Sequence, residues 1–262
     1  MTKRILITGS TDGIGLAAAK TLAAKGHEIV LHGRSADKIA AVKAANTELA
    51  EAASFCADLS DLNAVENMAR NVKGSYEKLD VLVNNAGVFK APNPKTPNGM
   101  DLRFVVNTLA PYILTRSLLP IVPLDGRIIN LSSAAQMPVD MAMMRGETPT
   151  SDSMAYAQSK LAITMWSRHM AQNLPDGPAV IALNPASFLG TKMVKDAYGS
   201  EGKDIAIGSD IIVRLALEAE FAGASGLYYD NDRGRIGPPH MDALDDEKVR
   251  ELVEFINSAL DV

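Results

Sequence analysis

Cysteine and long hydrophobic runs are nearly absent from this sequence. Cys56 is the only cysteine in 262 residues, so the chain cannot form an internal disulfide and does not imply an oxidising compartment. The apolar run that follows Met1-Thr2-Lys3-Arg4 is too short for a signal peptide, and we expect no stretch of about 18 apolar residues that could span a membrane. We therefore expect a soluble, cytoplasmic protein.

An excess of positive charge is also lacking. The chain has 26 Lys and Arg against 31 Asp and Glu, and its net charge of −5 repels nucleic-acid backbones and anionic lipid. Its four histidines, His27, His32, His169 and His240, have no metal-ligand spacing. Hydrophobic residues make up 47% of the chain and charged residues 22%, which is typical of a globular protein. We expect a small-molecule substrate, no nucleic-acid or membrane partner, no metal, and possible assembly into a homodimer or homotetramer.

Short apolar runs alternate with helix-forming segments along the whole chain. Runs typical of strands span residues 4–8, 28–32, 54–57, 79–84, 127–132, 179–183 and 226–229. Segments typical of helices span residues 16–24, 36–50, 63–72, 102–119, 155–173 and 210–219. This alternation predicts a single α/β domain over residues 1–262, with a doubly wound parallel sheet of about seven strands flanked by helices.

Two segments interrupt this alternation, at residues 136–153 and 186–207. Both follow predicted strands at their carboxyl ends, where open α/β sheets bind ligands, so we expect them to be substrate lids. The first contains Met137, Met141, Met143 and Met144, whose flexible side chains suit an apolar ligand. The alternative is that both segments are surface insertions without a role.

A glycine turn joins the first predicted strand to the first helix. Gly9, Gly13 and Gly15 allow positive φ and a close approach of the backbone to a ligand. The helix that follows offers free N–H groups and a positive dipole end, which favour a pyrophosphate. A glycine turn with only a structural purpose is the alternative.

The end of the second strand predicts the choice of dinucleotide. An acidic side chain there favours a free ribose 2′-hydroxyl, whereas a basic one favours a 2′-phosphate. The sequence reads His32-Gly33-Arg34, without a carboxylate. The planar donor fork of Arg34 therefore predicts NADP(H) over NAD(H), unless Arg34 is an ordinary solvated loop residue.

Further residues at strand ends are suited to a dinucleotide. Asp58 can accept a hydrogen bond from the adenine amino group, with the backbone of Leu59 beside it. The small residues Ala86 and Gly87 let the backbone approach a cofactor. For the preceding Asn84 and Asn85, a structural role is at least as well founded as cofactor contact.

Tyr156 and Lys160 lie four residues apart in a segment patterned as a helix, so both side chains project from one helical face. Ser132 and Ser133 end the fifth predicted strand, at the sheet edge where a ligand is expected. This combination suggests a proton donor beside a bound substrate.

Taken together, these motifs resemble the short-chain dehydrogenase/reductase family over nearly the whole chain. The resemblance rests on Thr8-Gly9-Ser10-Thr11-Asp12-Gly13-Ile14-Gly15, Asn84-Asn85-Ala86-Gly87, Asn107, Ser133 and Tyr156-Ala157-Gln158-Ser159-Lys160. It implies a Rossmann-type NAD(P)-binding domain, hydride transfer between nicotinamide and a carbonyl or alcohol, and Ser133, Tyr156, Lys160 and Asn107 as the catalytic tetrad. The predicted cofactor-binding residues are Gly9, Ser10, Thr11, Asp12, Gly13, Ile14, Gly15, Arg34, Asp58, Leu59, Asn85, Ala86, Gly87, Tyr156, Lys160, Pro185 and Thr191.

Each catalytic role has a physical basis. Tyr156 can exchange a proton with the substrate oxygen, Lys160 can lower the pKa of the tyrosine and hydrogen-bond the ribose, and Ser133 can polarise the carbonyl. Pro111 has no N–H, so the Asn107 carbonyl loses its helical partner and can hold a water that relays protons from Lys160. An ordinary proline kink is the alternative.

Two features depart from the common family pattern. The long interval between Ser133 and Tyr156 resembles the retinol-dehydrogenase-like members, which act on bulky apolar alcohols and ketones. Pro185-Ala186 replaces the usual Pro-Gly, which weakens the expected contact of Thr191 with the carboxamide, while Pro185 and Phe188 can still pack against the nicotinamide ring.

We expect an NADP(H)-dependent oxidoreductase for a small apolar carbonyl or secondary alcohol, with Tyr156 as the general acid and base. The alternative from another class is a catalytically silent NADP(H)-binding redox sensor or scaffold. An epimerase or dehydratase is a third candidate, although such enzymes usually have extra sequence for a nucleotide-sugar site.

Overall fold

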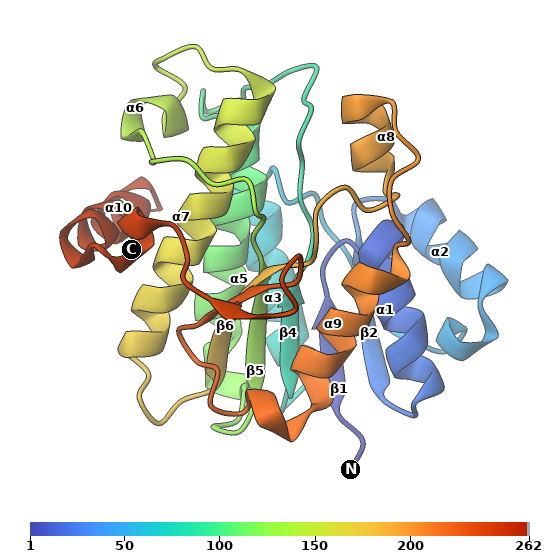
Figure 1. Ribbon diagram of the computed structural model, residues 1–262. Helices are drawn as coiled ribbons and strands as arrows, with labels where there is room; N and C mark the ends of the chain where they lie inside the picture. The colour runs from blue at the N-terminus through green and yellow to red at the C-terminus, as the bar shows by residue number, and fades with distance from the viewer. Residues whose placement is uncertain (261–262) are drawn as a thin grey trace.

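The computed structural model describes residues 1–260, which form a three-layer α/β domain around one sheet (Figure 1). The strands of the sheet are β1 (Arg4–Ile7), β2 (Glu28–Gly33), β3 (Ala53–Cys56), β4 (Val81–Asn84), β5 (Arg127–Leu131), β6 (Ala179–Asn184), β7 (Tyr228–Asp230) and β8 (Arg235–Gly237). Their order is β3-β2-β1-β4-β5-β6-β7-β8. The first seven strands are parallel, and β8 pairs antiparallel with β7. The predicted doubly wound, Rossmann-type architecture is confirmed.

Helices cover both faces of the sheet. They are α1 (Gly13–Ala24), α2 (Ala36–Ala45), α3 (Leu62–Ser75), α4 (Leu102–Phe104), α5 (Ala110–Leu118), α6 (Met141–Met144), α7 (Asp152–Gln172), α8 (Lys192–Tyr198), α9 (Ala206–Leu217) and α10 (Asp246–Ala259). Shorter helical segments are η1 (Thr47–Leu49), η2 (Val105–Leu109), η3 (Leu119–Ile121), η4 (Ala219–Phe221) and η5 (Met241–Leu244). Figure 1 shows α6 and α8 at the same end of the molecule, opposite the amino terminus.

The alternation of side chains along β1 explains why the sheet is covered on both sides. Ile5 and Ile7 face the layer formed by α1 and α9, whereas Leu6 faces the layer that contains α3 and α5. Successive strand residues point to opposite faces, so a strand with a completely apolar sequence requires two apolar layers. A third cluster around Trp166 lies between α7 and α10.

The structure contains elements that were not predicted from the sequence. The short strand β8 extends the expected seven strands to eight. Helix α8 lies inside segment 186–207, and α6 lies inside segment 136–153. Helix α10 was missed although Val249, Leu252, Val253 and Ile256 repeat at helical spacing and Asp245 caps the first turn.

Three of the four methionines of the predicted lid pack against the protein core, and the lid itself stays a prediction. Met144 is fully buried, and Met141 and Met143 pack against the same core cluster, which includes Trp166. Met143 sulfur also accepts a hydrogen bond from Gln158 Nε2 at 3.1 Å. Of the four, only Met137 has an exposed side chain. Burial in a core explains the methionines because their unbranched side chains fill irregular gaps.

One apolar helical stretch, Leu102–Ile121, is long enough to cross a membrane by length and composition, although we expected no such stretch. Within the protein 72% of it is buried, as in a core helix.

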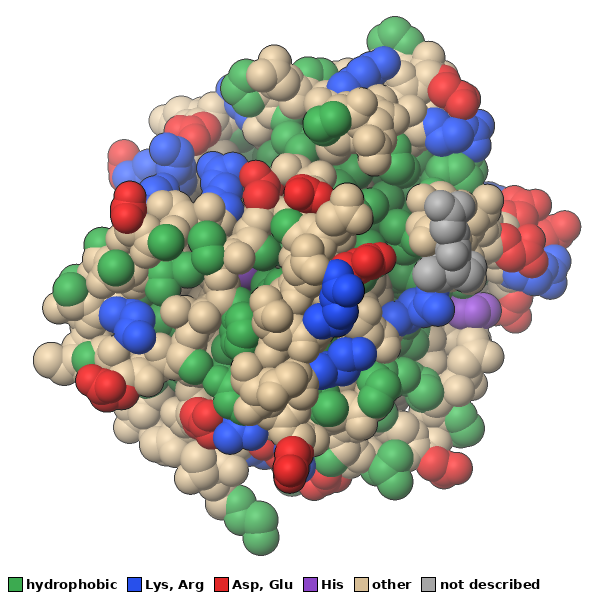
Figure 2. Space-filling model, turned by 180° about the vertical axis from the view of Figure 1, so that it is seen from behind, with side chains coloured by type: hydrophobic (Ala, Val, Ile, Leu, Met, Phe, Trp, Pro, Cys, Tyr) green, Lys and Arg blue, Asp and Glu red, His purple; other side chains and the backbone are tan. Residues whose placement is uncertain are grey.

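Figure 2 shows the surface seen from behind, where Lys and Arg side chains are interspersed with Asp and Glu.

Candidate active site

A cavity of about 430 Å³ lies at the carboxyl ends of the parallel strands. It is lined by the segments that follow β1, β2, β3, β4, β5 and β6. The lining residues are Gly9, Thr11, Asp12, Gly13, Ile14, His32, Gly33, Arg34, Ser35, Lys38, Ala57, Asp58, Leu59, Ser60, Asn85, Ala86, Gly87, Val88, Leu102, Val106, Leu131, Ser132, Tyr156, Lys160, Pro185, Thr191, Lys192 and Met193. Most of the residues predicted to bind a cofactor therefore meet in one place.

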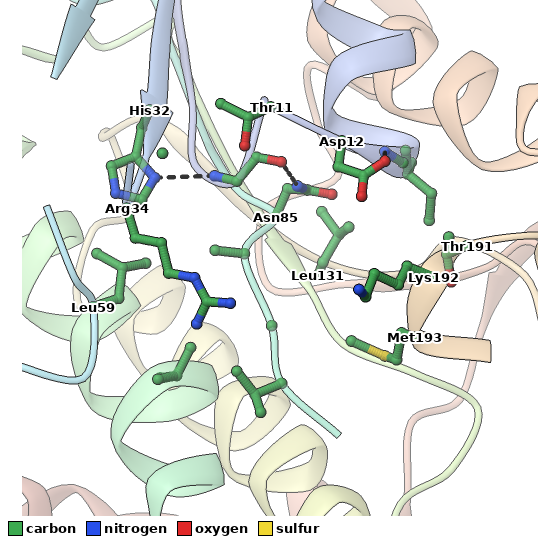
Figure 3. A pocket seen from close by; sticks show the side chains of 18 of the residues that line it. Thr11, Asp12, His32, Arg34, Leu59, Asn85, Leu131, Thr191, Lys192 and Met193 are labelled. Carbon is green, nitrogen blue, oxygen red and sulfur yellow. Dashed lines mark hydrogen bonds between the residues drawn. The ribbon is translucent and has the colours of Figure 1, made fainter. Parts of the chain in front are cut away.

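The glycine turn is held close to the end of β4. Gly9 has a φ of +64°, and a Cβ there would lie 3.0 Å from Ala86 Cα. The Asn85 side chain donates hydrogen bonds to the Thr8 carbonyl at 2.8 Å and to the Gly9 carbonyl at 3.2 Å. Figure 3 shows the Asn85 side chain at the cavity with one of these bonds. A side chain at Gly15 would collide with this amide, because its Cβ would lie 2.4 Å from Asn85 Nδ2.

Two predicted cofactor contacts, Ser10 and Gly15, do not line the cavity. Ser10 is fully buried, and its hydroxyl accepts a hydrogen bond from His32 N at 2.9 Å. Gly15 leaves room for Asn85. Both residues support the turn without facing the cavity. The sequence motif alone does not distinguish this role from direct contact with a cofactor.

His32 is a site residue that the sequence analysis missed. It is buried, its Nδ1 accepts from Gly9 N at 3.0 Å, and its Nε2 lies 3.1 Å from the Ala57 carbonyl (Figure 3). A ring that accepts at Nδ1 and donates at Nε2 is neutral, and burial lowers the His32 pKa to about 4. The imidazole therefore joins the ends of β1, β2 and β3 beneath the cavity.

Three cations, Arg34, Lys38 and Lys192, line the cavity. Figure 3 shows the Arg34 guanidinium and the Lys192 ammonium entering it from opposite sides. Lys38 lies in the first turn of α2, whose amino terminus is capped by the Ser35 hydroxyl. None of the three forms a salt bridge within residues 1–260. Unpaired cations beside a glycine turn fit a phosphate-bearing dinucleotide.

The predicted adenine and carboxamide contacts also lie at the cavity. The Asp58 carboxylate is fixed by the backbone N–H of Ser60 at 2.9 Å and by its hydroxyl at 2.8 Å. Thr191 caps α8 through Val194 N at 3.3 Å, and Pro185 lies nearby on the same wall. Phe188 does not line the cavity, so its expected packing against a nicotinamide ring is not what the structure shows.

Tyr156 and Lys160 project from α7 into the inner end of the cavity. Lys160 Nζ lies 5.5 Å from the centre of the Tyr156 ring and donates a hydrogen bond to the Leu131 carbonyl at 2.6 Å. A Cβ at Gly87 would lie 3.5 Å from this nitrogen, so the glycine keeps the ammonium accessible from the cavity.

The pKa of Tyr156 shifts in the direction opposite to that expected. Burial raises it above its usual value, and the Ser133 side chain opposes this rise only in part. Burial also lowers the Lys160 pKa to about 8. Desolvation is the largest cause of the rise in the Tyr156 pKa, and the phenol therefore keeps its proton at neutral pH.

Ser133 and Ser132 have different roles in the structure. The Ser133 side chain lowers the pKa of Tyr156, and its Oγ accepts a hydrogen bond from Ala135 N at 3.1 Å. The Ser133 backbone carbonyl accepts from the Tyr228 hydroxyl at 3.0 Å. Ser132 is buried, and its hydroxyl donates to the Lys160 carbonyl at 2.8 Å. Ser132 lines the cavity and Ser133 does not, so Ser133 is connected to the site through its effect on the pKa of Tyr156.

Asn107 lies in the π-helical segment η2 and contacts Ser159 of α7. Its side chain accepts from Val88 N at 2.8 Å and donates to the Val88 carbonyl at 2.9 Å and to Ser159 Oγ at 3.0 Å. The irregular helix ahead of Pro111 agrees with the effect predicted for the proline. Asn107 thereby connects the segment after β4 to α7.

Comparisons with known proteins agree with this arrangement. The family model for short chain dehydrogenase matches residues 3–201. The chain is 31% identical to human retinol dehydrogenase 13 over 95% of its length and 82% of that protein. It is 32% identical to human polyprenol dehydrogenase over 87% of its length and 76% of that protein. A Burkholderia cenocepacia short chain dehydrogenase, solved in complex with NADP, superposes with a TM-score of 0.70 at 28% identity, covering 86% of this chain and 94% of that one.

Proposed function

This chain belongs to the short-chain dehydrogenase/reductase family, and on that premise we propose that it is an NADP(H)-dependent oxidoreductase. Its substrate would be a small apolar carbonyl compound or secondary alcohol, with Tyr156 as the general acid and base. The observation that carries this proposal is that Tyr156 and Lys160 line the same cavity as three cations that form no salt bridge within residues 1–260: Arg34, Lys38 and Lys192. A proton donor and a site for phosphate thus share one opening.

The nicotinamide, when bound, supplies or accepts the hydride. Tyr156 holds its proton at the phenol oxygen and donates it to a carbonyl oxygen as negative charge develops there. Ser133 polarises the same oxygen. Lys160 presents a buried positive charge at the inner end of the cavity, where it stabilises the phenolate left after proton transfer.

The protonation state of Tyr156 favours carbonyl reduction over alcohol oxidation at neutral pH. Reduction uses the phenol as a proton donor, whereas oxidation requires the phenolate as a base. Since burial raises the pKa of Tyr156, the donor form predominates. We therefore expect the rate of alcohol oxidation to increase as the pH rises.

The preference for NADP(H) is supported by Arg34 and Lys38 at the end of β2 and the start of α2. Both are basic and unpaired, so a dianionic 2′-phosphate would gain interactions that a 2′-hydroxyl cannot make. Asp58 is fixed by Ser60 and remains available as an acceptor.

An apolar substrate is supported by the side chains that line the inner part of the cavity: Val88, Leu102, Val106, Leu131 and Met193. A catalytically silent NADP(H) sensor would need only the cofactor half of the site. The presence of Tyr156 and Lys160 in the same cavity favours an enzyme over that alternative. A cytoplasmic location stays a prediction from the sequence.

Replacing Tyr156 with Phe tests the proposed function. The variant keeps the ring that packs 4.9 Å from Phe89 but loses the transferable proton. We expect single-turnover oxidation of NADPH by a carbonyl substrate to slow by about 100-fold or more, while the NADPH dissociation constant changes by less than about two-fold. Tyr76→Phe, at a tyrosine that does not line the cavity, is the control. Wild-type turnover by the Tyr156 variant would overturn the role of Tyr156.

A further inference from the structure

Three aromatic side chains continue outward from Tyr156. The distance between ring centroids is 4.9 Å for Phe89 and Tyr156, 5.7 Å for Phe89 and Tyr198, and 5.3 Å for Tyr198 and Phe188. They come from the segment after β4, the end of α8 and the segment after β6. We call Phe89, Tyr198 and Phe188 the aromatic path.

The outer part of the aromatic path is exposed at a cost in free energy. Phe188 and Tyr198 are 54% and 56% exposed, although most large apolar side chains of this protein are buried. Phe188 also has a φ of +57°, a left-handed conformation that is unfavourable for a bulky residue. These residues lie outside the cavity lining but are connected to it through Phe89 and Tyr156. Strain combined with exposure next to a ligand cavity indicates a surface kept for binding.

Hydrogen bonds fix the backbone on both sides of Phe188, so its ring has a defined position. Ser187 donates from its N–H at 2.9 Å and from its hydroxyl at 2.5 Å to the Asp232 carboxylate. The Phe188 carbonyl accepts from Lys203 N at 2.6 Å. These contacts hold the residue in the left-handed conformation.

A second contact aligns the inner part of the path. Lys90 Nζ donates to the Asp196 carbonyl in α8 at 2.6 Å. This bond joins the segment that carries Phe89 to the helix that ends in Tyr198. The rings are thus fixed relative to Tyr156, and they begin where a carbonyl would meet the proton donor.

We propose that the aromatic path is a subsite for a planar aromatic ring of the substrate, so that the enzyme prefers ketones carrying an aryl group near the carbonyl. This inference rests on the proposed oxidoreductase function and specifies its substrate class. Tilted ring pairs gain from the opposite charges of ring edge and ring face, beyond the area they bury. A saturated ring of the same size has no such distribution of charge.

The test compares two ketones that differ only in the ring, 4-phenylbutan-2-one and 4-cyclohexylbutan-2-one. Two methylenes insulate the carbonyl from the ring, so the intrinsic reactivities match. With NADPH in excess, we expect wild-type kcat/KM to be about 2- to 10-fold higher for the phenyl ketone. This ratio should fall to about 1 in Tyr198→Leu and Phe188→Leu, which keep an apolar side chain.

The control is Tyr76→Leu, which removes an aromatic ring that pairs with Phe55 outside the site and should leave the ratio unchanged. Equal kcat/KM for both ketones in the wild type, or an unchanged ratio in both leucine variants, would overturn the subsite while the oxidoreductase function stands. Turnover of neither ketone would contradict the proposed function itself and the subsite with it.

Discussion

Arg34 decides the choice of cofactor if its guanidinium contacts the 2′-phosphate. It is exposed at the mouth of the cavity and forms no hydrogen bond that would give it a structural role within residues 1–260. Arg34→Ala should weaken NADPH binding by about 30- to 150-fold, the effect of losing a charge-assisted contact, and leave NADH binding nearly unchanged. Titration calorimetry with both cofactors measures this difference.

The control for this variant is Arg70→Ala, which removes an exposed arginine from α3 and should change neither affinity. Equal weakening of NADPH and NADH by Arg34→Ala would show that the residue maintains the fold of the loop rather than selecting the cofactor.

His32 makes the stability of the protein depend on pH. Its folded pKa of about 4 lies below the usual value of 6.5, so the neutral ring favours the native state. Its contribution is complete above pH 6.5 and is lost as the pH falls toward 4. At pH 5 the loss should reach about 2 kcal/mol of unfolding free energy relative to pH 7.5.

The variant His32→Asn isolates this effect, because an amide oxygen can still accept from Gly9 N but does not titrate. Urea unfolding at pH 5 and pH 7.5 should show a smaller decrease in the variant than in the wild type. The same decrease in both proteins would mean that other groups cause the acid sensitivity.

At the residue scale, the sequence predicts the residues of the family motifs better than the residues that contact them in the folded site. The spacing of Tyr156 and Lys160 and the glycines of the first turn require no tertiary information. His32 and Lys192 come near these residues only after distant segments meet, so no local pattern reveals them. The direction of the Tyr156 pKa shift depends on burial, which is likewise a property of the folded protein.

At the scale of elements, a buried ion cluster fixes the start of the catalytic helix. The Arg103 side chain is 1% exposed and contacts the Asp101 carboxylate at 2.7 Å and the Asp152 carboxylate at 2.6 Å. Asp152 is the first residue of α7, one turn before Tyr156. The cluster therefore joins α4 to the helix that carries the proton donor.

Arg103→Leu should lower the unfolding free energy by about 3 to 5 kcal/mol, because it leaves the Asp101 carboxylate buried without a partner. Adding Asp101→Asn should restore part of the loss, since the amide keeps the cap on Arg103 N and carries no charge. Thermal and urea unfolding measure both variants. No recovery in the double variant would contradict the explanation by an unpaired charge.

Long elements were predictable and short ones were not. Strands β4 to β6 are completely buried and read as apolar runs, and α7 has a continuous helical sequence. Strand β8 has only three residues, and it forms by pairing with β7 at the edge of the sheet. The methionines of segment 136–153 resembled a ligand surface because composition does not show which side of a loop faces the core.

At the scale of the whole molecule, the charge distribution separates the cavity from the rest of the surface. The chain carries a net charge of −5, yet Arg34, Lys38, Lys192 and Lys160 line one cavity together with only Asp12 and Asp58. Such a cavity attracts a polyanion to one place while the remaining surface repels it. Cofactor affinity should accordingly weaken as ionic strength rises.

Cofactor binding should also stabilise the entire fold, because the cavity is built from six strand ends that separate on unfolding. At an NADPH concentration of 100 times its Kd, linkage predicts about 2.7 kcal/mol of added stability. For a chain of this size, that corresponds to a rise in Tm of about 5 to 10 °C by differential scanning fluorimetry. Tyr156→Phe should keep this rise at the same NADPH concentration, since it keeps the binding residues, whereas Arg34→Ala should lose most of it. An equal rise with the same concentration of NADH would contradict the preference for NADP(H), and no rise with either dinucleotide would contradict the cofactor site.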